Sequence, residues 1–253
     1  MTGSWRRIAA TVVASVALVG GCTSAGSDPV GPSPSVGASG EPMSLVVMSF
    51  NIEYGGERVD FDSVAEAIEA AGADVVAIQE AYGNLSQIAA DVGWDYYDTR
   101  TQVVSRYPLL NQADPEARAV FVEVAPGQVV AVADVHLSST KYGPKLLAKG
   151  ARRSEVMSNE RAIRLPGLQP VLDEASSLMG QGIPVFVLGD FNAPSHRDWT
   201  RVTAGLRSHV TGRFRWPTSV AAERIGLVDS YRAVYPDPVL NPGFCTGSGY
   251  TAR

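Results

Sequence analysis

The sequence predicts an α/β fold, and three observations lead to that prediction. Short apolar runs rich in Val, Ile and Leu recur at 44–50, 74–78 and 183–188, as expected for buried strands. An amphipathic segment lies between the first two runs and makes a strand–helix–strand unit. The chain has 253 residues, of which 45% are hydrophobic, so it is long enough for one large domain with a full core.

The helix of this first unit has recognisable ends. Residues 61–71 carry apolar side chains at helical spacing, with Asp60 or Asp62 near the expected N-cap and Gly72 where the helix should end. The second apolar run, 74–78, begins almost directly after that glycine. The unit is therefore predicted to be two strands joined by a helix.

Further elements are predicted downstream, in an order that mixes strands and helices. A short helix is followed by a short strand, an antiparallel hairpin and a charged amphipathic stretch that two prolines should break or kink into two helical pieces. The predicted ranges are 84–92 for the short helix, 102–105 for the strand, 117–124 and 128–136 for the hairpin, and 149–179 for the interrupted helix.

The first residues have the composition of a secretory leader. Arg6 and Arg7 precede an apolar run, 8–19, which is shorter than the ~20 residues that a membrane-spanning helix needs. The run ends in Leu-Val-Gly-Gly-Cys22, which resembles a bacterial lipobox, so Cys22 is predicted to be lipidated. An ordinary cleaved signal with an incidental cysteine is the alternative.

These features divide the chain into three segments. Residues 1–21 are predicted to be a lipoprotein signal peptide, 22–42 the lipidated Cys and a flexible Ser/Gly/Pro linker, and 43–253 the folded domain. We expect the domain to lie outside the cytoplasmic membrane, anchored to the bacterial cell membrane by lipid. Cys22 and Cys245 are the only cysteines, which excludes a disulfide framework and a four-thiolate zinc site.

The charge balance argues against a dedicated nucleic-acid binder with a broad basic surface. The formal net charge is −5, whereas proteins that bind nucleic acid through a broad basic surface owe most of their affinity to Lys and Arg. An enzyme that neutralises phosphate charge with a bound metal ion is not excluded.

Polar residues follow the predicted strands where the strands end. They are Asn51, Glu80, His136 and the pair Asp190 and Asn192. Each alone has an ordinary explanation, such as a turn-forming Asn or a solvated Glu. Because strand ends converge at one edge of a sheet, we expect these side chains to meet there, and their oxygen atoms suit Mg²⁺ or Ca²⁺ better than zinc.

Taken in order, six segments resemble the endonuclease/exonuclease/phosphatase family, the deoxyribonuclease I-like superfamily. The resemblance implies a four-layer sandwich of two packed mixed β-sheets flanked by helices. The segments are Met48–Glu53 (MSFNIE), Ala77–Glu80 (AIQE), Val104–Leu109 (VSRYPL), Val132–Leu137 (VADVHL), Val187–Asn192 (VLGDFN) and Leu227–Arg232 (LVDSYR).

The resemblance also implies a role for each polar residue. Glu80 and Asn51 match the metal site, with Glu80 as the direct ligand of Mg²⁺, and Mn²⁺ or Ca²⁺ as alternatives. Asp190 matches the carboxylate that activates water, Asn192 the residue that orients it, and His136 a donor to the phosphate. The implied activity is metal-dependent hydrolysis of a phosphate ester.

The match departs from the family pattern at the C-terminus. An Arg-Ile-Asp-Tyr-like strand and a terminal Ser-Asp-His motif are missing, so we expect a C-terminally incomplete domain with unpaired sheet edges. The alternative function is therefore a catalytically inactive, truncated surface lipoprotein or binding module on the same fold. Within the enzyme hypothesis, a nuclease, a lipid phosphodiesterase and a phosphatase all stay open, and we expect a monomer.

Overall fold

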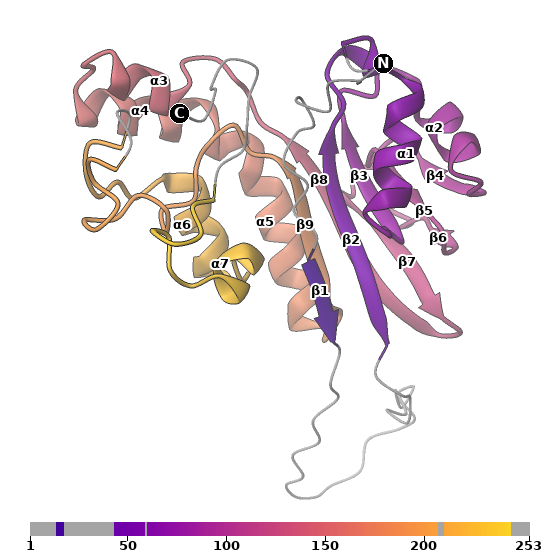
Figure 1. Ribbon diagram of the computed structural model, residues 1–253. Helices are drawn as coiled ribbons and strands as arrows, with labels where there is room; N and C mark the ends of the chain where they lie inside the picture. The colour runs from indigo at the N-terminus through magenta and orange to yellow at the C-terminus, as the bar shows by residue number, and fades with distance from the viewer. Residues whose placement is uncertain (1–13, 18–42, 59, 207–209, 244–253) are drawn as a thin grey trace, which may run out of the picture.

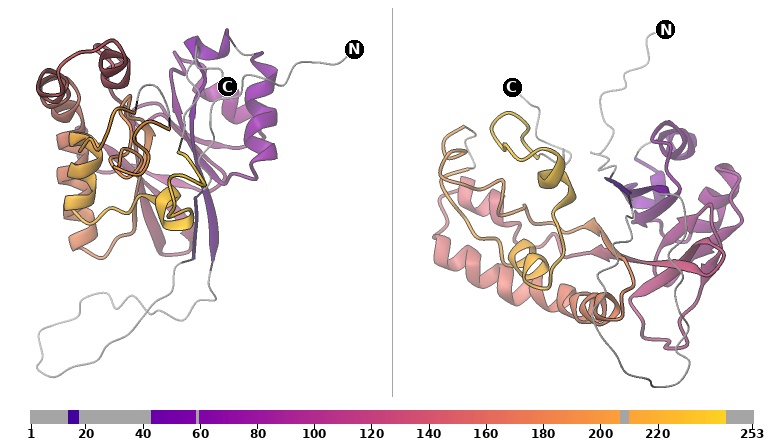
Figure 2. Two further views of the ribbon diagram at one scale, coloured as in Figure 1. Left: turned by 60° about the vertical axis from the view of Figure 1, so that its left-hand side comes forward. Right: turned by 90° about the horizontal axis from the view of Figure 1, so that it is seen from below.

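The computed structural model describes residues 14–17, 43–58, 60–206 and 210–243, and these form a four-layer α/β sandwich (Figure 1). Two β-sheets pack face to face, and helices cover the outer face of each, as the two views of Figure 2 show. The predicted fold class is therefore confirmed. Within the described residues, no helix is both long and apolar enough to cross a membrane.

The first sheet has five strands in the order β1-β2-β3-β5-β4. β2 and β3 are parallel and joined by helix α1, as predicted for the strand–helix–strand unit, while the other neighbours are antiparallel. Helices α1 and α2 pack on the outer face of this sheet. The bounds are β1 Ala14–Ala17, β2 Ser44–Asn51, α1 Asp62–Ala70, β3 Val75–Gln79, α2 Leu85–Asp91, β4 Tyr96–Asp98 and β5 Val103–Ser105.

The second sheet has four strands in the order β6-β7-β8-β9. β7 and β8 form the predicted antiparallel hairpin, and β9 lies parallel to β8 at the edge of the sheet. Helices α5 and α6 pack on the outer face. The bounds are β6 Leu109–Leu110, β7 Ala119–Ala125, β8 Gln128–His136, α5 Leu165–Gly180, β9 Val185–Asp190 and α6 Pro217–Arg224.

The remaining helices are a short 3-10 helix, η1, directly after β2, and three helices in the second half of the chain. The stretch predicted as an interrupted helix contains α4 and α5, which meet at Arg164, whereas Pro170 lies inside α5 and does not end it. A short helix before α4 was not predicted. The bounds are η1 Tyr54–Gly56, α3 Gly143–Ala148, α4 Arg153–Ile163 and α7 Ser230–Val234.

The expected capping of α1 is only partly correct. The N-cap residue is Phe61, and no side chain makes a capping hydrogen bond there, because Ser63 N–H bonds instead to the backbone carbonyl of Asp60. Gly72 does follow the helix end in a left-handed conformation, with φ 61°. Packing of Val64 and Ile68 on the sheet stabilises α1 in place of a side-chain cap.

Four residues of the predicted leader belong to the first sheet. β1 pairs antiparallel with the outer edge of β2, with Ala14 opposite Val47 and Ala17 opposite Ser44. An edge strand offers unpaired backbone N–H and C=O groups, which β1 satisfies. Cys22, the linker to residue 42 and Cys245 lie outside the described residues.

Strand β9 approaches β8 so closely that one position admits only glycine. Gly189 pairs with Val135 and has φ 137°, and an added Cβ would lie 1.9 Å from the Val135 carbonyl oxygen. The residue after it is Asp190, one of the predicted site residues. The close approach therefore sets where the Asp190 carboxylate stands relative to β8.

Replacing this glycine tests the close approach. We expect Gly189→Ala to lower the free energy of unfolding by about 3 kcal/mol, because the backbone of β8 must move to admit the methyl group. Gly182→Ala is the matched control, since Gly182 also has a positive φ (81°) but nothing within 4 Å of an added Cβ. It should lose only about 1–2 kcal/mol in urea unfolding, and equal losses would contradict the explanation.

Candidate active site

In four strands, the side chains that point between the two sheets are apolar along most of the strand and polar at its C-terminal end. The inner core between the sheets is apolar, but the last one or two inward positions of each strand are polar. β2 and β3 are parallel, as are β8 and β9, and the Asn51–Asp190 hydrogen bond joins the ends of the two pairs on the upper side in Figure 1. The inward positions are Leu45, Val47, Ser49 and Asn51; Val75, Ala77 and Gln79; Val130, Val132, Asp134 and His136; and Phe186, Leu188 and Asp190.

Asn51 joins the two sheets at this edge. Its Nδ2 donates to Glu80 Oε1 at 3.1 Å and to Asp190 Oδ2 at 3.2 Å. Its Oδ1 accepts from the backbone N–H of Glu53 at 2.9 Å, which fixes the orientation of the amide. One amide group thus holds two carboxylates that are 110 residues apart in the chain.

His136 and Asn192 complete the group of predicted site residues. His136 Nε2 lies 3.7 Å from Glu80 Oε1 and 4.0 Å from Asp190 Oδ2, and the imidazole is 37% exposed. The backbone N–H of Asn192 donates to Asp190 Oδ1 at 2.9 Å, and its side-chain amide donates to the Leu137 carbonyl at 2.8 Å. The structure therefore brings all five predicted residues of the domain together.

Glu80 reaches the site because the backbone leaves the regular strand there. Strand alternation would point Glu80 to the helix-covered face, but its φ of 61° turns the chain so that the carboxylate meets Asn51. Burial would raise the pKa of Glu80, yet the Tyr54 N–H, the Asn51 amide, the charge of His136 and the Tyr82 hydroxyl together lower it. Glu80 is therefore held as a carboxylate.

Two further residues beneath the site were not assigned a role from the sequence. Gln79, which is 2% exposed, donates from Nε2 to Asp134 Oδ1 at 2.6 Å and so links the two sheets below Asn51. Burial raises the pKa of Asp134 to about 7, with a further contribution from the Asp190 carboxylate, although the Gln79 hydrogen bond opposes the rise. A two-residue period applied to β3 and β8 would have marked both as inward polar residues.

Two tyrosines beside Glu80 were also missed. The backbone N–H of Tyr54 donates to Glu80 Oε2 at 3.0 Å, and the hydroxyl of Tyr82 hydrogen-bonds to the same carboxylate. The Glu80 charge in turn raises the pKa of the Tyr82 phenol, which keeps its proton for that bond. Each tyrosine lies a few residues beyond a predicted strand, and this position could have indicated that both lie near the site.

The charge of the site fits a divalent cation. Glu80 and Asp190 share one amide donor, and no Lys or Arg in the described part of the chain forms an ion pair with either carboxylate. The described residues contain no ready set of three or more His, Cys, Asp or Glu ligands. Mg²⁺ keeps several waters and is often bound through one or two carboxylates, so this pair of acids suits it.

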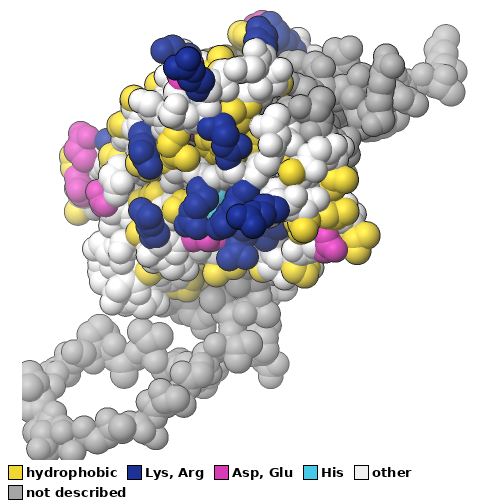
Figure 3. Space-filling view, turned by 90° about the vertical axis from the view of Figure 1, so that its left-hand side faces the viewer, with side chains coloured by type: hydrophobic (Ala, Val, Ile, Leu, Met, Phe, Trp, Pro, Cys, Tyr) yellow, Lys and Arg dark blue, Asp and Glu magenta, His cyan; other side chains and the backbone are white. Residues whose placement is uncertain are grey.

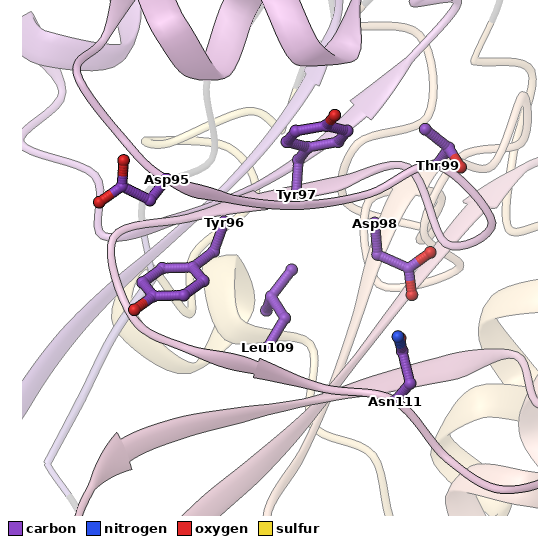
Figure 4. A pocket seen from close by; sticks show the side chains of 7 residues that line it. All are labelled: Asp95, Tyr96, Tyr97, Asp98, Thr99, Leu109 and Asn111. Atoms are coloured by element: carbon purple, nitrogen blue, oxygen red, sulfur yellow. The ribbon is translucent and has the colours of Figure 1, made fainter.

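A separate pocket lies away from these residues. Figure 4 shows it between β4 and β6, lined by Tyr96, Tyr97, Asp98 and their neighbours. None of the strand-end residues lines it. The geometry therefore favours the sheet edge, rather than this pocket, as the place for chemistry.

Basic side chains gather on another face of the molecule. Figure 3 shows Lys and Arg over the face that carries α3 and α4, where Arg153 stacks on Phe214 with 5.0 Å from Cζ to the ring centroid. His196 lies near Arg197 and Arg215, and its Nε2 is 3.1 Å from Glu223 Oε2. Burial is the largest cause that lowers the pKa of His196. The net negative charge is thus unevenly distributed.

The fold and the strand-end site define a class of protein that comparison confirms. Residues 48–251 match the model of the Endonuclease/Exonuclease/phosphatase family, and the chain belongs to that family. Its members are generally hydrolases that act on phosphate esters and typically use divalent metal ions.

A relative is found in an animal. An uncharacterized protein of Caenorhabditis elegans is 29% identical over 221 residues, which cover 78% of this chain and 68% of that protein. The similarity extends over most of the folded domain, in keeping with the family match.

Asp134 should make the metal-free protein less stable as the pH rises. In the unfolded chain an Asp titrates near ~3.9, so between about pH 4 and pH 7 the folded protein holds a proton that the unfolded chain releases. The stability that this proton contributes is present below pH 4 and lost through pH 7. Asp134→Asn cannot ionise, so its stability relative to the wild type should increase with pH, by at least about 1 kcal/mol between pH 5 and pH 8.

Urea unfolding in the presence of a chelator measures this difference. Asp173→Asn, an exposed carboxylate on α5, serves as the control and should show the same pH dependence as the wild type. A gain for Asp134→Asn that is equal at pH 5 and pH 8 would contradict a protonated Asp134.

Proposed function

We propose that the protein is a Mg²⁺-dependent phosphoric ester hydrolase with its active site at the joined edge of the two sheets. The observation that carries the proposal is the convergence of Glu80 and Asp190 on the Asn51 amide, with His136 beside both. Two carboxylates without a Lys or Arg partner in the described chain give a charge that a divalent cation offsets. The family match supports the same chemistry at the level of class.

Each side chain has a role in this proposal. Glu80 supplies the carboxylate for the cation, and Asn51 orients it through the 3.1 Å hydrogen bond. The cation, when bound, acts as a Lewis acid on a phosphate oxygen. Asp190 accepts a proton from the attacking water. The Asn192 N–H holds its Oδ1, and the Asn51 amide holds its Oδ2 on the side that faces His136.

His136 is positioned to meet the substrate. Its imidazole is exposed, and its Nε2 lies 3.7 Å from Glu80 Oε1 and 4.0 Å from Asp190 Oδ2. A donor at this place hydrogen-bonds to a phosphate oxygen, which bears more negative charge as the ester bond breaks. The chain then has one residue for each need of the reaction: cation, base and phosphate donor.

Activity assays with matched variants test this proposal. We expect hydrolysis of a chromogenic phosphodiester to need Mg²⁺ and to fall at least about 100-fold in Asp190→Asn and in Glu80→Gln, because the first removes the base and the second the carboxylate ligand. Asp173→Asn is the control and should keep the wild-type rate.

The assay also separates the enzyme from the alternative. Rates that survive a chelator, or that are equal in wild type and Asp190→Asn, would rule out the proposed site. If no Mg²⁺-dependent hydrolysis of diesters or monoesters is found, a non-catalytic lipoprotein or binding module on this fold becomes the better hypothesis.

The proposed location is outside the cytoplasmic membrane, as a monomer on a lipid anchor at Cys22. The support comes from the sequence of the leader and linker. If the residues before Cys22 are removed, β1 is removed with them, and the outer edge of β2 loses the partner that it has in this structure. The lipidated protein would then need another way to protect that edge.

The intact mass of the protein extracted from its own membranes tests the anchor. We expect a mass that includes diacylglycerol on Cys22 and lacks residues 1–21. The Cys22→Ala variant should no longer be found in the membrane fraction, because the thiol that forms the bond to the lipid is missing. A variant that stays in the membrane fraction would contradict the anchor, and a mass beyond Arg253 would show that more residues complete the domain.

A further inference from the structure

Two exposed aromatic rings stand beside the proposed site. Tyr54 follows β2 and is 49% exposed, and Tyr82 follows β3 and is 68% exposed. Their ring centroids are 6.4 Å apart and their planes are tilted by 50°. The Arg58 guanidinium lies 4.0 Å from the centroid of the Tyr54 ring. The result is an aromatic corner with a positive charge, open to solvent.

Both tyrosine residues contact the carboxylate that we assign to the cation, Tyr54 through its backbone and Tyr82 through its hydroxyl. Glu80 Oε2 accepts from the Tyr54 backbone N–H at 3.0 Å, and the Glu80 side chain accepts from the Tyr82 hydroxyl. A group that rests on these rings therefore lies next to a phosphate held at Glu80.

The backbone that presents the rings is strained. Glu53, Tyr54, Glu80 and Tyr82 all have positive φ, at 49°, 54°, 61° and 47°. The two loops interlock, because Gly55 N–H donates to the Glu80 carbonyl and Asn84 Nδ2 donates to the Gly55 carbonyl. Residues other than glycine adopt such conformations at a cost in free energy. Because both rings are exposed, packing of the rings in the protein does not offset this cost.

We propose that Tyr54 and Tyr82 form a stacking subsite for an unpaired nucleobase joined to the phosphate that the site hydrolyses. Stacking on exposed aromatic rings is how proteins hold single-stranded bases, and a nearby Arg meets the charge of a neighbouring phosphate. A lipid or polyol headgroup has no flat ring to stack. Bases inside a duplex are already stacked on each other, so the subsite takes a nucleotide or a single strand.

The inference rests on the proposed function for the phosphate but is tested by binding alone. The probes are a fluorescein-labelled ten-nucleotide oligothymidylate and an abasic strand with the same backbone and length. With Mg²⁺ present and Asp190→Asn as the background that prevents hydrolysis, the whole protein should bind the base-carrying strand about tenfold more tightly than the abasic strand in fluorescence anisotropy. Tyr54→Leu and Tyr82→Leu should each reduce that preference toward equal binding.

Two further variants separate stacking from other roles of the tyrosines. Tyr82→Phe keeps the ring and loses the hydroxyl bond to Glu80, so it should keep the base preference and lose turnover. Tyr97 is an exposed tyrosine on β4 that lines the separate pocket. Tyr97→Leu should therefore keep both the base preference and the turnover.

The outcomes distinguish this inference from the proposed function. Equal binding of the two strands when both tyrosines are in place, or an equal effect of Tyr97→Leu, overturns the subsite whether or not the protein hydrolyses diesters. A base preference that depends on Tyr54 and Tyr82 supports the subsite even if no hydrolysis is detected.

Discussion

The gathering of two carboxylates on one amide is the constraint on which the architecture of this site depends. Glu80 and Asp190 come from different sheets and meet at Asn51, with Asp134 close below. Like charges at such separations repel, and only a rigid frame keeps them there without a cation. The parallel pairs β2–β3 and β8–β9 provide that frame, since register and twist leave the strand ends little freedom.

The same constraint explains the unusual chemistry beneath the site. Gln79 and Asp134 join the sheets with a short hydrogen bond, in a place where the core is otherwise apolar. Burial beside other acids favours a protonated Asp134, which lowers the number of negative charges at the edge. The rise in its pKa is therefore part of how the protein tolerates a concentrated acidic site.

Charge and aromatic surface are divided among regions of the molecule. The acids lie at the sheet edge, Tyr54 and Tyr82 stand beside them, and the basic side chains gather over α3 and α4. A net charge of −5 describes none of these regions by itself. For recognition of a phosphate ester, the local arrangement matters more than the sum, because exposed charges are screened beyond about 10 Å.

The sequence by itself determined which residues could form this fold and site. Apolar runs define β2, β3, β8 and β9, and the polar residue at each end was visible in the chain, so the α/β class and the five strand-end residues were predictable. The four-layer sandwich was implied by the family resemblance. The sequence was silent on β4 and β6, which are two or three residues long. It located the start of α1 to within one residue of Phe61 but did not show that no side chain caps it. Only the tertiary structure decided that Glu80 turns inward at a positive φ, that Gln79 meets Asp134 and that two tyrosines flank the acids. Those features depend on contacts between segments far apart in the chain, and local patterns carry no information about which distant strand will stand opposite.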